Sequence, residues 1–302
     1  MHSLINKIQS KIKSKIILDY DMKNSTWFRA GGKALGYVIA NNVSDLKTII
    51  SYADQIKYYI VGVGSNLMVR DGGFDGLIIK LGKNFNKIKI NQDTLSAGAG
   101  VLDVNLAKFA LKKSIKDFEF FSGIPGTIGG AIKMNAGCYG SQTADNLKRI
   151  LVINHLGKIK YFTKGELELK YRSSNLTDEL IVLKADFSCK YSSVSEIIEK
   201  KNYIKLKRES SQPIKEKTSG STFKNPSGEY AASLIEKAGC KGMKNGGASV
   251  STIHSNFIIN NGEATALDIE NLGKEIIKQV QLKFGITPVS YTHLTLPTKR
   301  IV

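Results

Sequence analysis

The sequence is poor in cysteine, proline and tryptophan, with 3, 5 and 1 of these among its 302 residues. The cysteines, Cys138, Cys189 and Cys240, are widely spaced and form no C-x-x-C pair. This spacing argues against a disulfide framework and against a zinc site, and it favours reduced, partly buried thiols. His155 and His254 are isolated in the sequence, so we expect structural histidines rather than metal ligands.

A long apolar run is also missing. No stretch of about 18 consecutive apolar residues occurs, so no transmembrane helix is expected. The N-terminal residues alternate lysine with isoleucine and lack the continuous apolar core of a secretory signal. Both absences favour a cytoplasmic protein.

Acidic residues are few beside the basic ones: 26 Asp and Glu face 44 Lys and Arg, which gives a net charge of +18. Such a balance can attract nucleic acid or a small anionic substrate. The lysines are spread along the whole chain, and no DNA- or RNA-recognition motif occurs. We therefore favour an anionic small substrate, with a nucleic-acid binder as the alternative.

The apolar spacing predicts a mixed α/β protein of two or three domains. Residues 4–18 are expected to form an amphipathic helix packed on the protein's own core, with a membrane-surface helix as the alternative. A linker is expected at 210–213, and Thr265 with Asp268 predicts a capping box. Strands are predicted at 37–40, 58–63, 77–79, 94–99, 181–185 and 256–260, and helices at 44–53, 101–113, 194–209, 231–238 and 267–284.

A first glycine loop, residues 61–67, directly follows a predicted strand. Gly62 and Gly64 let the backbone bend and approach a diphosphate, and Ser65 and Asn66 add hydrogen-bond donors. A dinucleotide-binding Rossmann loop would have a third glycine where Leu67 stands, so this is not a Rossmann NAD site. A simple tight turn is the alternative.

A second glycine segment, residues 123–131, is denser. Each glycine inside regular structure costs roughly 0.5–1 kcal/mol relative to alanine, so four of them require a reason. Close approach to an extended ligand would supply it, and two separated segments that grip one diphosphate are more specific than either alone. A structural loop is the alternative. The candidate cofactor-binding residues of this segment are Gly123, Pro125, Gly126, Thr127, Gly129 and Gly130.

Two polar segments could carry chemistry. Arg172, in the segment 171–174, could hold a carboxylate in a fork, although an exposed surface arginine explains the local sequence as well. In the segment 218–226, Ser221 could point toward a ligand while Lys224 and Asn225 reach its polar groups. Because no Gly-x-Ser-x-Gly pattern is present, a proton-donating serine is favoured over an acyl-enzyme serine. A solvated turn is the alternative.

Together and in this order, these segments resemble the UDP-N-acetylenolpyruvoylglucosamine reductase family of peptidoglycan synthesis. The resemblance runs from about Lys23 to Ile286, and the short spacing from Arg172 to Ser221 is similar to the subclass without an extra substrate-domain insertion. The segments that carry it are 24–32, 61–67, 98–101, 123–140, 171–174, 220–226, 247–251 and 254–258.

The resemblance implies an α/β fold with an FAD-binding part of the vanillyl-alcohol-oxidase (PCMH) type. This part would span residues 21–195, with subdomains of about 21–82 and 83–195, after an N-terminal helix within 1–20. A substrate-binding α/β domain would follow at 205–286. FAD would lie over the two glycine segments, at Gly62, Gly64, Ser65, Asn66 and Leu67 and at the residues of the second segment named above.

The resemblance also implies a reaction in two halves. NADPH would pass a hydride to the flavin, which would pass it to the vinyl carbon of UDP-N-acetylglucosamine enolpyruvate and so give UDP-N-acetylmuramate. Arg172 would stabilise the negative charge that develops beside the carboxylate, and Ser221 would protonate the carbon. Arg208, Lys224 and Asn225 would contact the substrate. We expect a monomer that binds neither nucleic acid nor membrane.

The C-terminal end departs from the family pattern. The family has a catalytic glutamate in a strand shortly after its last helix, whereas the last carboxylate of this sequence is Glu275, inside the predicted helix. We interpret residues 287–302 as an atypical, foreign segment. Since one catalytic acid commonly contributes roughly 10²–10⁴ in rate, two alternatives stay open. One is a catalytically impaired relative that binds FAD and substrate, and the other is a different flavin oxidase of the same fold.

Overall fold

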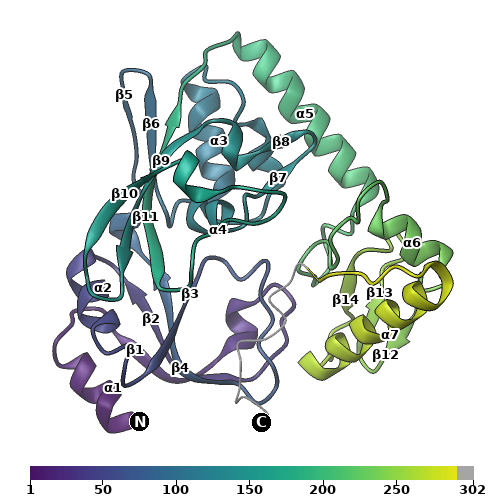
Figure 1. Ribbon diagram of the computed structural model, residues 1–302, viewed down its shortest axis with the longest axis horizontal. Helices are drawn as coiled ribbons and strands as arrows, with labels where there is room; N and C mark the ends of the chain where they lie inside the picture. The colour runs from purple at the N-terminus through teal and green to yellow at the C-terminus, as the bar shows by residue number, and fades with distance from the viewer. Residues whose placement is uncertain (291–302) are drawn as a thin grey trace. The chain divides into compact units, whose positions relative to one another are not determined.

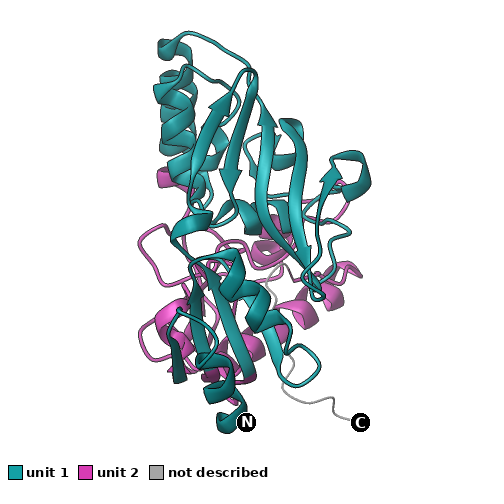
Figure 2. Ribbon diagram, turned by 90° about the vertical axis from the view of Figure 1, so that its left-hand side faces the viewer, with its two compact units in different colours: residues 1–18, 36–62, 76–207 teal, residues 19–35, 63–75, 208–302 magenta. Residues whose placement is uncertain are grey.

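The computed structural model describes residues 1–290, and these form two compact units (Figure 2). Each unit is discontinuous in sequence, because two N-terminal segments fold with the C-terminal part of the chain. The contiguous domain spans inferred from the resemblance remain predictions, since compactness alone does not tell which residues bind which ligand. Unit 1 comprises residues 1–18, 36–62 and 76–207, and unit 2 comprises 19–35, 63–75 and the described residues from 208 onward.

The N-terminal helix is shorter than predicted. α1 spans His2–Gln9, and the chain from Ile16 already belongs to a strand, so the predicted helix 4–18 is wrong beyond Gln9. Side chains hold the intervening turn: Asp45 Oδ2 accepts from the backbone N–H and the hydroxyl of Ser14, at 2.7 and 2.6 Å, and Gln9 Oε1 accepts from Ile16 N at 2.7 Å. These bonds satisfy backbone N–H groups of Ser14 and Ile16 that a longer helix would have used.

Most of the first sheet lies in unit 1. It has four strands in the order β1-β2-β4-β3 (Figure 1), and β3 pairs with β4 in parallel. The centre of β4 is fully buried, as expected for a strand covered on both faces. The predicted helix beside this sheet is present, although Asn42 caps it rather than Ser44. The elements are β1 (Ile16–Asp21), β2 (Lys33–Ala40), α2 (Val43–Ile50), β3 (Lys57–Val61) and β4 (Phe74–Leu81).

The second sheet of unit 1 is antiparallel, in the order β10-β9-β11-β6-β5. The short helix α4 packs against β11 and β6, and α3 contacts the 3₁₀ helix at Glu119–Gly123. β7 and β8 form a small hairpin. The elements are β5 (Ile88–Asn91), β6 (Thr94–Gly98), α3 (Asp103–Lys112), α4 (Ile128–Lys133), β7 (Gly137–Cys138), β8 (Ser141–Gln142), β9 (Leu147–Asn154), β10 (Ile159–Thr163) and β11 (Leu180–Ser188).

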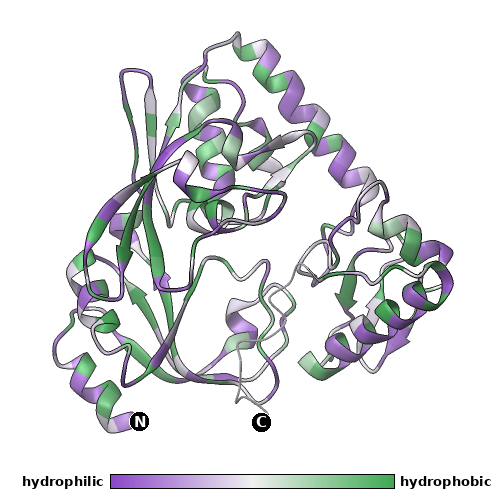
Figure 3. Ribbon diagram, viewed as in Figure 1, coloured by the Kyte–Doolittle hydropathy of each residue, from purple (hydrophilic) through white to green (hydrophobic). Residues whose placement is uncertain are grey.

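Helix α5 spans Val194–Ser211 and is mostly hydrophilic (Figure 3). Only Ile197 and Ile204 are buried on it. The predicted linker at 210–213 is therefore partly helical. The helix stops before Pro213, whose ring cannot continue the hydrogen-bond ladder.

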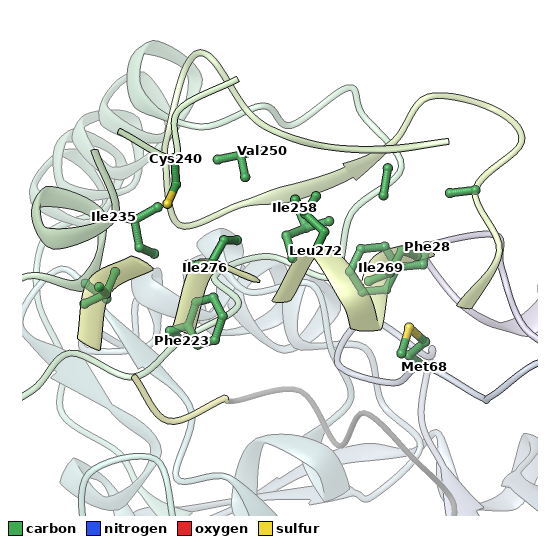
Figure 4. Packing of buried hydrophobic residues seen from close by; sticks show 14 of the residues in the cluster. Phe28, Met68, Phe223, Ile235, Cys240, Val250, Ile258, Ile269, Leu272 and Ile276 are labelled. Carbon is green, nitrogen blue, oxygen red and sulfur yellow. The ribbon is translucent and has the colours of Figure 1, made fainter. Parts of the chain in front are cut away.

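Unit 2 is built around α7, which packs against α6 and a three-stranded sheet in the order β12-β13-β14. The predicted capping box of α7 is confirmed: Thr265 accepts from Asp268 N, and Asp268 accepts from Thr265 N. Figure 4 shows the buried cluster, in which Phe28 and Met68 from the N-terminal segments join side chains of the C-terminal part. The elements are α6 (Ala231–Lys237), β12 (Lys244–Asn245), β13 (Ala248–Val250), β14 (Ile258–Asn260) and α7 (Ala266–Phe284).

None of the three cysteines forms a disulfide, with Cys138 and Cys189 half-buried and Cys240 buried. Within residues 1–290, no helix combines the length and the apolar character needed to cross a membrane.

Candidate active site

The predicted site residues are divided between the two units. Those of unit 1 are Gly62, Gly123, Pro125, Gly126, Thr127, Gly129, Gly130 and Arg172. Those of unit 2 are Gly64, Ser65, Asn66, Leu67, Arg208, Ser221, Lys224 and Asn225.

The two glycine segments meet inside unit 1, at Gly62 and Thr127. A Cβ added to Gly62 would come within 2.6 Å of Thr127 Oγ1, so a side chain at position 62 would push the segments apart. Gly130, in contrast, has only Thr127 Oγ1 near its added Cβ, at 3.7 Å. The contact therefore needs glycine at position 62, and it leaves room beside Gly130.

The second glycine segment is partly helical rather than a continuous loop. Thr127 stands directly before α4, which begins at Ile128. Its backbone pairs with the start of α3 and with the chain just before it: Asp103 N donates to Gly126 O at 3.1 Å, and Gly129 N donates to Ala99 O at 2.8 Å. Internal packing thus explains two of the glycines, because a side chain at 126 would collide with the Asp103 carboxyl and one at 129 would press on Ala99.

Asp103 was not predicted as a site residue. It is 1% exposed, and neither carboxyl oxygen has a hydrogen-bond partner within the described part of the chain. Burial raises the pKa of Asp103 well above its usual value. In the sequence it reads only as an acidic residue in the first turn of a helix, which is common and favourable for the helix dipole.

Arg172 lies in a tight turn of unit 1, where Lys170 and Ser173 exchange two backbone hydrogen bonds of 3.1 and 3.2 Å. Its φ of 53° is in the left-handed region, which is strained for a side chain of this size. The guanidinium donates to Gly137 O. Buried Asn135 donates to Lys170 O at 3.0 Å and fastens the turn to the chain just after α4. Arg172 is therefore held in place, unlike a solvated surface arginine.

In unit 2, the rest of the first loop packs on the segment before it. Gly64 has a φ of 69°, its carbonyl accepts from Trp27 N at 3.0 Å, and an added Cβ would collide with Ser25 O. Leu67 is 5% exposed and belongs to the packed interior, and its contact with FAD stays a prediction. Ser65 and Asn66 are half-buried.

The segment with Ser221 is extended rather than a solvated turn. Ser221 forms an antiparallel bridge with Phe257, and Thr222 N donates to Asn256 O at 2.7 Å. On the other side, Lys224 N donates to Val289 O at 2.7 Å. The segment therefore lies between two other segments of the same chain, one with Phe257 and one with Val289. Ser221 itself is half-buried.

Two predicted substrate contacts have structural partners. Asn225 Oδ1 accepts from Ala231 N at 3.0 Å, at the start of α6, which leaves its amide N–H groups for a ligand. Arg208 Nε donates to Gln212 Oε1 at 3.2 Å at the end of α5. Lys224 is half-buried, and its neighbour Phe223 is anchored in the core.

His254 has a structural environment. Its Nδ1 accepts from Asn256 N at 3.3 Å, and its ring lies edge-on to Phe257 at 4.8 Å between centroids. Burial lowers the pKa of His254, which favours the neutral ring. Among residues 1–290, no group of three or more His, Cys, Asp and Glu side chains could hold a metal ion.

Comparison with known proteins identifies both parts of the chain. Residues 34–163 match the family model described as FAD binding domain, and residues 212–289 match UDP-N-acetylenolpyruvoylglucosamine reductase, C-terminal domain. The chain is 46% identical to the UDP-N-acetylenolpyruvoylglucosamine reductase of Rickettsia typhi over 276 residues, which cover 91% of this chain and 94% of the relative. The Rickettsia prowazekii enzyme is 44% identical over the same length and coverage.

The chain belongs to the UDP-N-acetylenolpyruvoylglucosamine reductase family. The solved structure of the Thermus caldophilus UDP-N-acetylenolpyruvylglucosamine reductase is similar, with a TM-score of 0.81 and 31% identity, covering 94% of this chain and 99% of that one. The predicted family and the α/β fold with an FAD-binding part of the vanillyl-alcohol-oxidase (PCMH) type are thereby confirmed.

The C-terminal match of this reductase-family chain reaches residue 289, so it includes the first residues of the segment that we interpreted as foreign. Val289 and Ser290 lie beside Lys224 and Phe223. The rest of that segment, 291–302, lies outside the described residues.

Proposed function

We propose that this chain catalyses the NADPH-dependent reduction of UDP-N-acetylglucosamine enolpyruvate to UDP-N-acetylmuramate, with FAD as its resident cofactor. The observation that carries the proposal is the 46% identity to the Rickettsia typhi reductase over 94% of that enzyme. The same sequence contains both the FAD-binding part and the C-terminal reductase domain that this chemistry requires.

The residues in unit 1 fit FAD. The close contact of Gly62 with Thr127 brings the two glycine segments together, and Gly130 leaves room next to it. Backbone N–H groups near these glycines, with the Thr127 hydroxyl, would hold the diphosphate. When bound, FAD supplies the hydride that NADPH delivers to it.

Arg172 and Ser221 would act on the enolpyruvyl group. Hydride addition to the vinyl carbon places negative charge on the neighbouring carbon and its carboxylate, and the fixed guanidinium of Arg172 would stabilise that charge as it develops. Ser221 would then give its proton to the carbon. Because Arg172 is anchored to Gly137 before substrate arrives, little reorganisation is needed during the reaction.

Lys224, Asn225 and Arg208 would bind the substrate. The substrate carries a diphosphate and a carboxylate, so two cations and an amide donor match its polar groups. The net charge of +18 would also favour the approach of this anion. A monomeric, cytoplasmic enzyme that binds neither nucleic acid nor membrane remains our prediction from the sequence.

Steady-state kinetics test this proposal. Without oxygen, the FAD-loaded protein should oxidise NADPH over many turnovers only when UDP-N-acetylglucosamine enolpyruvate is present, and the product should be UDP-N-acetylmuramate. Ser221→Ala should lower kcat by roughly 10²–10⁴, while FAD remains bound. Arg172→Lys should also be impaired, because an ammonium group cannot replace the planar fork. A folded protein that cannot be loaded with FAD would overturn the proposal.

One specific observation favours a second candidate, a relative that binds FAD and substrate but protonates slowly. No carboxylate follows Glu275 in the sequence, whereas the family pattern implied by the resemblance has a glutamate after the last helix. Such a protein would accept hydride from NADPH at a normal rate and would be reoxidised slowly by the substrate. In that case, a variant with a glutamate in place of one of residues 287–290 should be reoxidised faster by the substrate.

A further inference from the structure

Asn256 uses its whole side-chain amide on one residue of the segment that carries Ser221. Its Oδ1 accepts from Phe223 N at 2.9 Å, and its Nδ2 donates to Phe223 O at 2.8 Å. Its backbone carbonyl accepts from Thr222 N at 2.7 Å. Asn256 is 4% exposed, so these bonds are shielded from water.

This contact needs both a donor and an acceptor on the same side chain. An amide provides both, whereas an ionised carboxylate only accepts, and it would repel the carbonyl oxygen of Phe223. The Phe223 side chain is 1% exposed and fixed in the core of unit 2, where it appears in the cluster of Figure 4. Core packing and the Asn256 amide thus fix Phe223 from two directions.

Ser221 is two residues before Phe223 and forms a bridge with Phe257, the residue after Asn256. Gly220, directly before it, has a φ of 83° and no atom within 4 Å of an added Cβ. The backbone directly before Ser221 is therefore in a conformation that favours glycine, and the buried residues Thr218 and Ser219 precede it. The bonds of Thr222 and Phe223 to Asn256 fix the backbone directly after Ser221.

We propose that Asn256 is a positioning residue, whose amide fixes the backbone after Ser221 and so aims the Ser221 hydroxyl at the substrate carbon. The inference rests on the proposed role of Ser221 as proton donor. Small misplacements of a reacting group can lower a rate by up to about 10²-fold. Loss of the amide should therefore slow protonation of the substrate and leave FAD binding and the reaction with NADPH unchanged.

The test separates the two half-reactions of the FAD-loaded protein under anaerobic conditions. In Asn256→Ala, reduction of the flavin by NADPH should keep its wild-type rate, and reoxidation by the enolpyruvyl substrate should be about tenfold to a hundredfold slower. In steady-state turnover the same loss should lower kcat and leave KM unchanged. In Asn256→Asp, reoxidation should be equally slow at high pH and should recover as the pH falls, since a protonated carboxyl again both donates and accepts. His254 and Glu236 also titrate near this site, and dividing by the Asn256→Ala rate at each pH removes their contribution.

Asn260→Ala is the matched control. Asn260 is equally buried in unit 2, and its side chain binds Phe28 O, Gly262 N and Ala264 N instead of the Ser221 segment. It should lose stability without a specific loss of reoxidation rate. Reoxidation at the wild-type rate in Asn256→Ala, an absence of recovery in Asn256→Asp, or an equal loss in Asn260→Ala would each overturn the inference. A wild-type protein that the substrate never reoxidises would instead overturn the proposed function.

Discussion

Asp103 shows how a residue can be unfavourable for stability and still be retained in a folded chain. Its carboxyl is fully buried against Gly126, and neither oxygen has a partner within residues 1–290. Leaving such a group unsatisfied costs about 1–3 kcal/mol. Groups of this kind concentrate at functional sites, and Asp103 lies directly behind the segment that we expect to hold FAD.

The buried carboxyl predicts a pH-dependent stability difference for Asp103→Asn. Burial raises the folded-state pKa of Asp103 above its unfolded value of 3.8, so the folded state keeps a proton that the unfolded state releases. Stability from this group is therefore present near pH 4 and is lost as the pH rises through the folded pKa. Asp103→Asn should match the wild type near pH 4 and exceed it at pH 8 by about 1–3 kcal/mol. Urea unfolding at several pH values measures this difference.

Asp45→Asn is the control, because its effect on stability should change with pH in the opposite direction. Burial alone would raise the pKa of Asp45, but hydrogen bonds from Ser14 and Asn42 lower it below 3.8. Its stabilising contribution is present above the unfolded pKa and is lost as the pH falls through the folded one. Asp45→Asn should thus be less stable than the wild type at pH 8, with a smaller deficit near pH 3. Parallel pH curves for the two variants would contradict this account of the two carboxyls.

At the scale of elements, the first turn of α7 is stabilised twice. Its capping box is local and could be predicted from the sequence. In addition, Asp71 accepts from Ala266 N and Leu267 N, both at 2.9 Å, across nearly 200 residues of sequence. No pattern in the sequence predicts this second cap.

Asp71→Ala should destabilise unit 2 by about 1.5–3 kcal/mol, because two backbone donors lose a charged acceptor. Thr265→Ala should cost about 1 kcal/mol, the usual effect of losing a cap. Thermal or urea unfolding compares the two variants with Glu263→Ala. Glu263 is exposed, so this control should leave the free energy of unfolding nearly unchanged. An Asp71→Ala protein as stable as this control would show that the capping box alone holds the helix start.

The predictability of each element follows its periodicity. Helices α3 and α7, which have an apolar stripe, were predicted within a few residues, and so was α5, whose lysines and glutamates favour a helix. β9 and β10 were missed for physical reasons: β10 is an edge strand with exposed side chains, and β9 pairs with β11 through register shifts that break the alternation. The four-residue apolar spacing that predicted a helix over 4–18 also fitted the shorter α1 followed by a strand whose first residue, Ile16, is buried.

At the scale of the whole molecule, the residues of the site were easier to predict than the contacts that hold them. Gly62, Thr127, Arg172 and Ser221 stand in recognisable segments. Their supporting contacts join residues far apart in sequence, such as Asn256 with Phe223, and they depend on the fold. The sequence also did not predict that two N-terminal segments belong to unit 2. There Asn260 donates to Phe28 O, and Arg70 pairs with Glu270 at 3.0 Å.

The account's central claim is that this chain binds FAD and passes hydride from it to an enolpyruvyl sugar nucleotide. The most direct measurement follows the flavin absorbance after the NADPH-reduced protein is mixed with UDP-N-acetylglucosamine enolpyruvate without oxygen. We predict that the oxidised flavin spectrum returns and that one UDP-N-acetylmuramate forms per flavin, slowly if the absent glutamate limits protonation. A reduced flavin that oxygen reoxidises but this substrate never does would contradict the claim.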